Sequence, residues 1–130
     1  MSAEKPRILC VDDDPDILAY LEMVLEAEGF EFLGAASAEE GLRAFKETAP
    51  DLIILDLMME EVDAGTRFVK DLKLLGGEVP IFMLSSVGDN LSMTTDTGHL
   101  GLAGVFQKPV DRAQLLAVLR MSLDEPRAVE

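Results

Sequence analysis

Five short apolar segments recur along the chain, separated by stretches in which apolar and polar residues are mixed. The segments lie at residues 7–11, 31–35, 52–55, 80–84 and 104–107. A continuous apolar run of this length is typical of a strand that is buried on both faces of a sheet. The pattern therefore predicts five strands, of which 31–35 is the weakest candidate.

The stretch after the first strand predicts a helix over residues 15–28. Pro15 suits the first helical position, Asp14 before it suits the N-cap, and Gly29 ends the helix. The apolar residues of this stretch recur at the spacing of one buried helical face: Ile17, Leu18, Leu21, Val24 and Leu25. Asp14 is thus assigned to a structural position.

Similar signals predict the later helices. A helix over 38–48 begins with the capping box of Ser37 and Glu40. Another helix is expected after Asp63, and a last one follows the capping-box pattern that starts at Asp111. Strand and helix alternate five times, which predicts one α/β domain with a parallel sheet, helices on both faces and right-handed crossovers.

The composition narrows the range of possible partners and functions. The 130-residue chain has 25 acidic and 11 basic residues and a net charge of −14. This charge disfavours direct contact with nucleic acid, since phosphate binding depends on Lys and Arg. One cysteine, Cys10, excludes a disulfide framework. No apolar stretch approaches membrane-spanning length and the N-terminus lacks a signal-peptide core, so we expect a cytoplasmic protein without membrane contact.

Polar residues follow four of the five predicted strands. Asp12 and Asp13 follow the first strand, Asp56 the third, Ser85 the fourth and Lys108 the fifth. Each aspartate taken alone could be a helix or turn cap. In a parallel sheet, however, the carboxyl ends of the strands meet at one edge, where ligands bind. Three carboxylates repel one another there, and a divalent cation such as Mg²⁺ relieves the repulsion. A lysine and a hydroxyl beside that cation favour phosphoryl binding.

Four motifs carry a resemblance to a known family. They are Val-Asp-Asp-Asp-Pro at 11–15, Leu-Asp-Leu-Met-Met at 55–59, Pro-Ile-Phe-Met-Leu-Ser at 80–85, and Lys-Pro at 108–109. With these motifs in this order, the chain resembles the receiver domain of bacterial two-component response regulators. The resemblance covers about residues 6–123, and it leaves 1–5 and 124–130 as polar termini or linker.

The resemblance implies a doubly wound, flavodoxin-like sheet of five parallel strands in the order 2-1-3-4-5. It also implies that Asp56 accepts a phosphoryl group from phosphohistidine. Asp13, Asp56 and the backbone carbonyl of Met58 would be direct Mg²⁺ ligands, and Asp12 would act through a water molecule.

The remaining motif residues would contact the phosphoryl group. Ser85 is similar to the family's switch hydroxyl, and Lys108 resembles the lysine that pairs with the phosphoryl oxygens. Pro109 matches a proline that often follows a cis peptide bond in the family. The implied partners are a sensor histidine kinase or histidine phosphotransfer protein, and a downstream protein or fused output domain. Such a domain is a signalling module that catalyses only its own phosphorylation and dephosphorylation.

The chain departs from the family pattern in three places. Glu60, Glu61 and Ala64 stand where the family usually has proline and glycine in the loop after the acceptor. Val105 stands at the position of the usual aromatic switch residue, with Phe106 as its neighbour. The stretch at 87–100 lacks helical spacing, so a short or irregular helix is expected on a face that the family commonly uses for output.

Two other functions are compatible with parts of this pattern. One is a binding module that no longer depends on phosphorylation, which the Val105 departure favours and the intact acidic residues disfavour. The other is a Mg²⁺-dependent phosphohydrolase with Asp56 as nucleophile. Such enzymes commonly place a second aspartate two residues after the nucleophile, where this chain has Met58.

Overall fold

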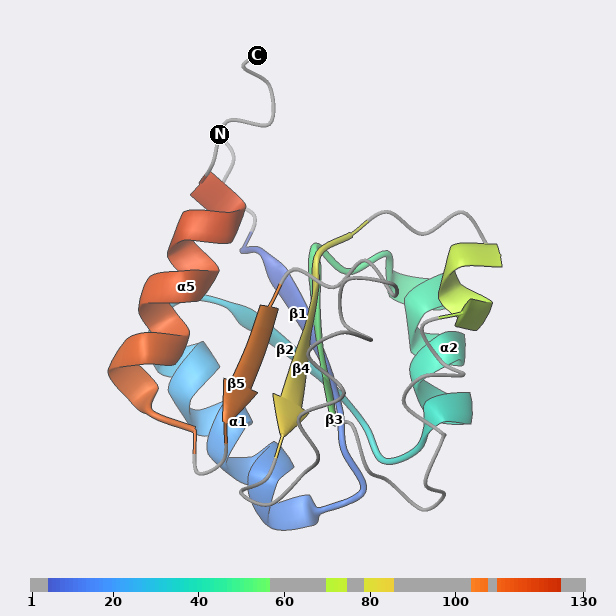
Figure 1. Cartoon of the computed structure of the whole chain (residues 1–130), viewed down its shortest axis with the longest axis horizontal. Coiled ribbons are helices and arrows are strands. Elements are labelled where there is room, and N and C mark those ends of the chain that lie inside the picture. Colours follow the sequence, from blue (N-terminus) through green and yellow to red (C-terminus); the bar gives the residue numbers. More distant parts are fainter. Residues whose placement is uncertain (1–4, 57–69, 75–78, 86–103, 108–109, 125–130) are drawn as a thin grey trace.

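The structure is a computed structural model, and it describes residues 5–56, 70–74, 79–85, 104–107 and 110–124. From β1 to β3, strands and helices alternate along the chain (Figure 1). The elements are β1 (Arg7–Val11), α1 (Pro15–Ala27), β2 (Glu31–Ala35), α2 (Ala38–Thr48), β3 (Leu52–Asp56), β4 (Ile81–Ser85), β5 (Gly104–Gln107) and α5 (Arg112–Asp124). Residues 70–74 add a short helical stretch.

All five strands form one parallel sheet in the order β2-β1-β3-β4-β5. This order confirms the doubly wound topology that the resemblance implied. The carboxyl ends of the strands lie at the lower edge of the sheet in Figure 1, where α1 begins. Strands β1 and β3 are neighbours in the middle of the sheet, with Val11 opposite Leu55. Side chains that follow these two strands are thereby brought together.

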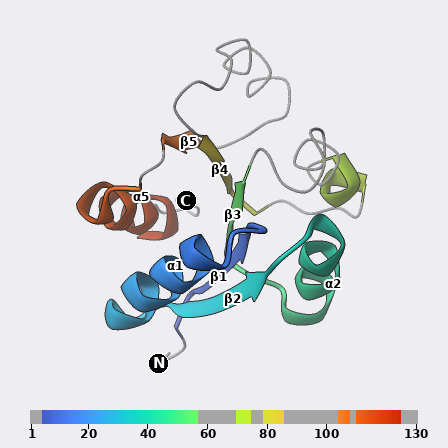
Figure 2. The same cartoon turned by 90° about the horizontal axis from the view of Figure 1, so that it is seen from below.

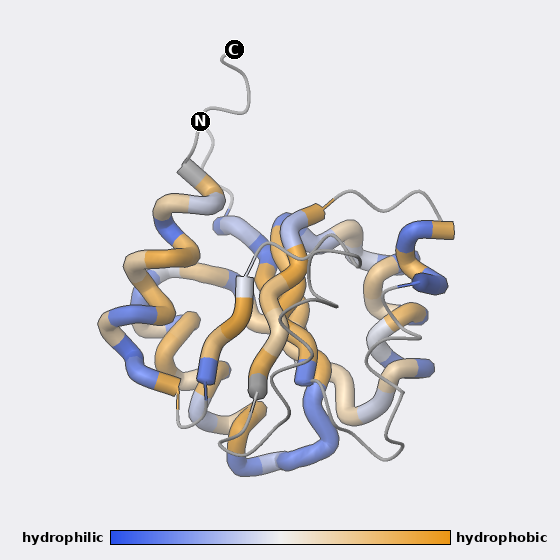
Figure 3. The backbone as a smooth tube through the Cα atoms, in the orientation of Figure 1, coloured by the Kyte–Doolittle hydropathy of each residue, from blue (hydrophilic) through white to orange (hydrophobic). Residues whose placement is uncertain are grey.

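Helices cover both faces of the sheet, with α1 and α5 on one face and α2 and the 70–74 stretch on the other (Figure 2). Successive strand residues alternate between the two faces. The α1/α5-side core comprises Ile8, Cys10, Leu21, Val24, Leu25, Phe30, Leu52, Ile54, Phe82, Leu84, Phe106, Val110, Leu115, Leu116 and Leu119. The α2-side core comprises Leu9, Val11, Ala35, Ile53, Leu55, Leu72, Ile81 and Met83. Figure 3 shows the resulting concentration of apolar residues in the strands.

The ends of α1 follow the predicted signals. Asp14 is the N-cap, and its Oδ1 accepts a hydrogen bond from the Asp16 amide at 2.9 Å. Pro15 occupies the first turn, where a missing N–H costs nothing. The helix ends at Ala27, one residue before the predicted end, and Gly29 follows with φ 91°. Glycine adopts this left-handed conformation without the strain of a Cβ atom.

Helices α2 and α5 also have their predicted caps. Ser37 Oγ accepts from the Glu40 amide at 3.1 Å, while Glu40 Oε1 accepts from the Ala36 amide at 3.0 Å. At the start of α5, Asp111 Oδ2 accepts from the Gln114 amide at 2.8 Å. These bonds satisfy amides at the helix starts that have no partner within the helix.

Strand β4 begins and ends one residue later than the predicted 80–84. Pro80 has no N–H to donate to a ladder, although its carbonyl accepts from the Ile53 amide at 3.0 Å. At the other end, Ser85 continues the ladder opposite Gln107. Most of the helix predicted after Asp63, and all of the irregular stretch at 87–100, lie outside the described residues. Within the described chain, no helix is both long enough and apolar enough to cross a membrane.

Candidate metal centre at the carboxyl edge of the sheet

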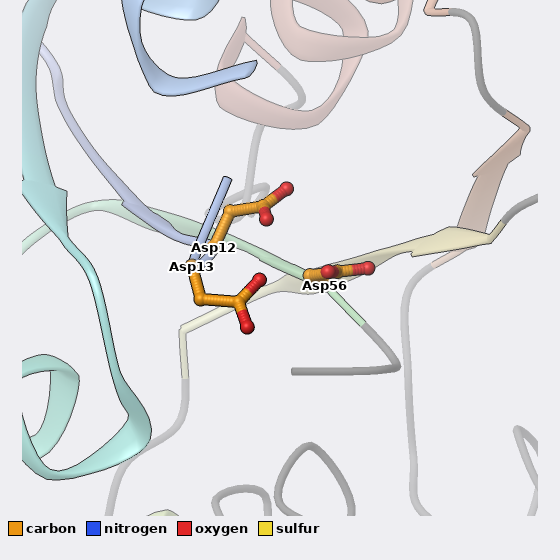
Figure 4. Close-up of side chains that lie close together, drawn as sticks. All are labelled: Asp12, Asp13 and Asp56. Carbon is orange, nitrogen blue, oxygen red and sulfur yellow. The ribbon is translucent and has the colours of Figure 1, made fainter. Parts of the chain in front are cut away.

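Three aspartates meet where β1 and β3 end. Asp12 and Asp13 follow β1 directly, and Asp56 is the last residue of β3. Figure 4 shows Asp12 and Asp13 just beyond β1, beside Asp56. One carboxylate oxygen from each residue lies within 4.8 Å of the others. The parallel arrangement of two neighbouring strands thus assembles the cluster from residues 44 positions apart.

Asp12 is held firmly at this edge. Its side chain is buried, with 1% of the residue exposed. Its backbone amide donates to the Ala35 carbonyl at 3.0 Å, and its Oδ1 accepts from the Asp14 amide at 2.9 Å. The second bond turns the chain from β1 into α1, so Asp12 has the turn-cap role that was open to each of these aspartates, in addition to its place in the cluster. An aspartate whose side chain accepts from the backbone amide two residues later forms an Asx-turn, and aspartate is common at such turns.

Asp56 is also buried, with 5% of the residue exposed, and it lies opposite Leu84 of β4. Asp13, in contrast, is exposed to solvent. Two carboxylates therefore line the inner part of the cluster and one lies at its open side. Among the three aspartates, Asp13 is the one that lies in contact with solvent.

The donor set suits a hard divalent cation. Carboxylate oxygens are the ligands that Mg²⁺ and Ca²⁺ prefer, and Mg²⁺ keeps several water molecules in its octahedral shell. Three aspartates in this small space bring negative charges together, and a bound cation would offset their mutual repulsion. The residues present therefore fit a magnesium ion with further positions left for other oxygen ligands.

Cys10 of β1, two residues before Asp12, is shielded from water. Its thiol is fully buried, and burial raises its pKa above the usual range, with a further contribution from the charge of Asp12. A thiol of this kind stays protonated and unreactive. Cys10 is therefore a core residue.

The remaining predicted site residues are only partly covered by the described chain. The backbone of Ser85 ends β4, which places it on the strand next to Asp56. Met58, Lys108 and Pro109 lie outside the described residues. Their chain neighbours Gln107 and Val110 lie within the described residues.

Strand β5 presents its two central residues to opposite faces. Val105 is 41% exposed, whereas Phe106 is 3% exposed and belongs to the α1/α5-side core. The Phe106 ring stacks on Phe82 with their centroids 5.4 Å apart. Gly104 makes room for this arrangement, because a Cβ atom there would lie 3.0 Å from the Phe82 ring. Phe106 therefore does not stand in for an aromatic residue at the Val105 position.

Comparisons with known proteins point to one family. The family model of the response regulator receiver domain matches residues 8–120. The transcriptional regulatory protein PrrA of Mycobacterium tuberculosis is 37% identical over 121 residues, which cover 91% of this chain and 50% of PrrA. The DNA-binding response regulator MtrA of Mycolicibacterium smegmatis is 34% identical over 130 residues, which cover 97% of this chain and 56% of MtrA. The chain thus spans about half the length of these relatives.

Solved structures agree with the sequence relatives. A CheY-like response regulator receiver domain protein from Methanospirillum hungatei matches with a TM-score of 0.85 and 30% identity, over 98% of this chain and 100% of that protein. A putative response regulator from Chloroflexus aurantiacus matches with a TM-score of 0.84 and 29% identity, over 94% of this chain and 100% of that protein. This chain belongs to the response regulator receiver domain family.

Proposed function

We propose that the chain is a phospho-accepting module of a two-component system, in which Asp56 takes a phosphoryl group from phosphohistidine on a partner protein. The observation that carries the proposal is the aspartate cluster. Asp56 ends a buried strand, and its carboxylate lies within 4.8 Å of those of Asp12 and Asp13. The partner would be a sensor histidine kinase or a histidine phosphotransfer protein.

The transfer is a displacement at phosphorus. A carboxylate oxygen of Asp56 forms a new O–P bond while the N–P bond of phosphohistidine breaks, and the imidazole nitrogen keeps the electron pair. A Mg²⁺ ion, when bound, neutralises charge on the phosphoryl oxygens and holds them beside the carboxylate. Asp13, Asp56 and the Met58 carbonyl would bind this ion directly, and Asp12 would bind it through water.

The other site residues receive supporting roles. The Lys108 ammonium pairs with a phosphoryl oxygen, and the Ser85 hydroxyl donates a hydrogen bond to another. Pro109 shapes the chain after Lys108. These roles are carried over from the family pattern onto residues that match it, and the position of Ser85 next to Asp56's strand supports that assignment.

The phosphorylated state would act through a change of shape that a downstream protein or a fused output domain reads. We take residues 6–123 as the receiver unit, with 1–5 and 124–130 as polar termini or linker. A cytoplasmic location suits this role, and the one buried thiol is compatible with a reducing compartment. The strongly acidic chain would leave any DNA contact to another domain or protein.

Acetyl phosphate and Mg²⁺ provide the test, with intact mass as the readout. Wild type should gain one phosphoryl group and Asp56→Asn should gain none. Asp51→Asn is a matched control, because Asp51 directly precedes the same strand and is exposed at its opposite end. It should be phosphorylated like wild type.

Two outcomes would contradict the proposal. Phosphorylation of Asp56→Asn would show that another residue is the acceptor. A wild-type protein that stays unmodified in Mg²⁺ would favour a binding module that works without phosphorylation.

A further inference from the structure

Asp14 makes two different hydrogen bonds at the start of α1. Its side-chain Oδ1 accepts from the Asp16 amide at 2.9 Å and caps the helix. Its backbone N–H donates to Oδ1 of Asp12, also at 2.9 Å. The Asp14 side chain therefore stabilises the helix, whereas its N–H contacts the aspartate cluster, and substitution at this one position separates the two contributions.

Helix α1 holds this donor in place. The Asp14 carbonyl accepts from the Leu18 amide at 3.2 Å, so the residue is bound to the first turn through its backbone as well as its side chain. The helix itself is anchored on the α1/α5-side core, where Leu21 is fully buried and the Tyr20 hydroxyl donates to the Val110 carbonyl at 3.0 Å. The direction of the Asp14 N–H is therefore fixed by the packing of a whole helix.

The acceptor, Asp12, is held from the side of the sheet. Its amide donates at 3.0 Å to the carbonyl of Ala35, the last residue of β2. The residue is 1% exposed, and one of its carboxylate oxygens lies within 4.8 Å of oxygens of Asp13 and Asp56. With the backbone bound to β2, the carboxylate still has rotation about its side-chain bonds. The hydrogen bond from the Asp14 N–H restricts that rotation.

We propose that Asp14 is a positioning residue for the divalent cation and acts through its backbone N–H, which fixes the orientation of the Asp12 carboxylate toward the cation and its water shell. This inference rests on the proposed function, which assigns the cation to this cluster. Two effects compete, because the hydrogen bond withdraws charge from the carboxylate but also holds it in the binding orientation. Loss of an outer-shell partner typically weakens metal binding about ten- to a hundredfold, so positioning should be the larger effect.

The test removes the N–H and keeps the rest of the chain. Lactic acid incorporated at position 14 replaces the amide with an ester, and Asp14→Ala is its matched partner, with the same side chain and the N–H intact. Calorimetric titration of the full chain with Mg²⁺ should show about tenfold weaker binding for the ester protein than for Asp14→Ala. Asp14→Pro also lacks the N–H, and the φ of −93° at this position lies within about 30° of the proline value. It should bind Mg²⁺ as weakly as the ester protein.

A double-mutant cycle separates positioning of Asp12 from a general disturbance of the helix start. In an Asp12→Ala background there is no carboxylate to orient, so the ester and the amide at position 14 should differ less than about twofold in Mg²⁺ affinity. Urea denaturation without Mg²⁺ checks that each compared protein is folded. The ester protein keeps the test available if Asp14→Pro does not fold.

Three results would overturn the inference. The ester protein could bind Mg²⁺ as well as Asp14→Ala, it could bind more tightly, or it could lose the same factor with and without the Asp12 carboxylate. If wild type binds no Mg²⁺ at all, the proposed metal-dependent function fails and this inference fails with it. A wild type that binds Mg²⁺, together with equal affinities of the ester and amide proteins, would remove this inference alone.

Discussion

Three consecutive aspartates at the end of β1 have three different surroundings. Asp12 is buried and accepts the Asp14 amide, Asp14 caps α1, and Asp13 is exposed at the open side of the aspartate cluster. Identical side chains thus differ in what they do: Asp12 turns the chain, Asp14 starts the helix, and Asp13 is left facing solvent. The surroundings differ because successive residues along the backbone point their side chains in different directions.

Substituting Asp13 and Asp14 should therefore have opposite consequences. Asp13→Asn should weaken Mg²⁺ binding and leave the fold intact, and it should stabilise the metal-free protein if it relieves carboxylate repulsion. Asp14→Ala should keep the Mg²⁺ affinity and lower the free energy of unfolding by about 1 kcal/mol, the usual cost of a lost N-cap. Calorimetry with Mg²⁺ and urea denaturation without it measure the two effects. Equal Mg²⁺ affinities in the two variants would contradict this division.

At the scale of elements, the packing of α5 on α1 combines apolar contacts with one charged group. Leu115, Leu116 and Leu119 of α5 are buried in the α1/α5-side core. At its surface, the Glu28 carboxylate at the end of α1 accepts from Arg112 at 3.2 Å and also from Arg120. One acidic residue therefore binds both the first and the third turn of α5.

The stability of this helix pair should depend on pH. The hydrogen bonds from Arg120 and Arg112 lower the pKa of Glu28 below its ordinary value. A carboxyl whose pKa is lower in the folded state contributes stability above its unfolded pKa and loses it as the pH falls through the folded pKa. Glu28→Gln should therefore be less stable than wild type near neutral pH, and the difference should shrink in acid. Both arginines are half exposed, so the effect should be small.

Urea denaturation between about pH 7 and pH 3 measures this difference. Glu22→Gln changes an exposed glutamate of the same helix and serves as the control. A Glu28→Gln deficit that stays constant or grows in acid would show that the carboxylate is not the source of the stability.

At the scale of the whole molecule, one sheet separates two apolar cores and gathers charge at one edge. The protein carries a net charge of −14, and two of its buried carboxylates, those of Asp12 and Asp56, lie at the carboxyl end of the sheet. The apolar strands stabilise the fold, while the charged edge opposes it and is available for a cation. Binding and stability should therefore be coupled.

Mg²⁺ should raise the free energy of unfolding of the wild-type protein. A ligand that binds only the folded state contributes about 2.7 kcal/mol at a concentration one hundred times its Kd. Removing the metal with EDTA should reverse the gain, and Asp13→Asn should show little of it at the same Mg²⁺ concentration. Thermal denaturation in Mg²⁺ and in an equal ionic strength of NaCl separates specific binding from charge screening. An equal rise in both salts would argue against a metal site.

Much of the fold could be predicted from the sequence because its signals are local. Apolar runs of four or five residues identified every strand, and the side-chain oxygens of Asp14, Ser37 and Asp111 identified the helix starts. Backbone periodicity and capping act within a few residues, so each signal is complete in a short window. The order of strands and the ligand roles required the resemblance to a family.

Other features were decided only by the tertiary structure. The sequence does not tell that Tyr20 reaches Val110, that Glu28 binds two arginines of α5, or that Asp12 and Asp56 are buried while Asp13 is exposed. The hydrogen bonds of Tyr20 and Glu28 join segments far apart in the chain, and the burial of the aspartates likewise depends on how helices and strands lie against one another. Local periodicity specifies which face of an element is buried, but only the packing of those faces determines which polar atoms at their edges come within hydrogen-bonding distance.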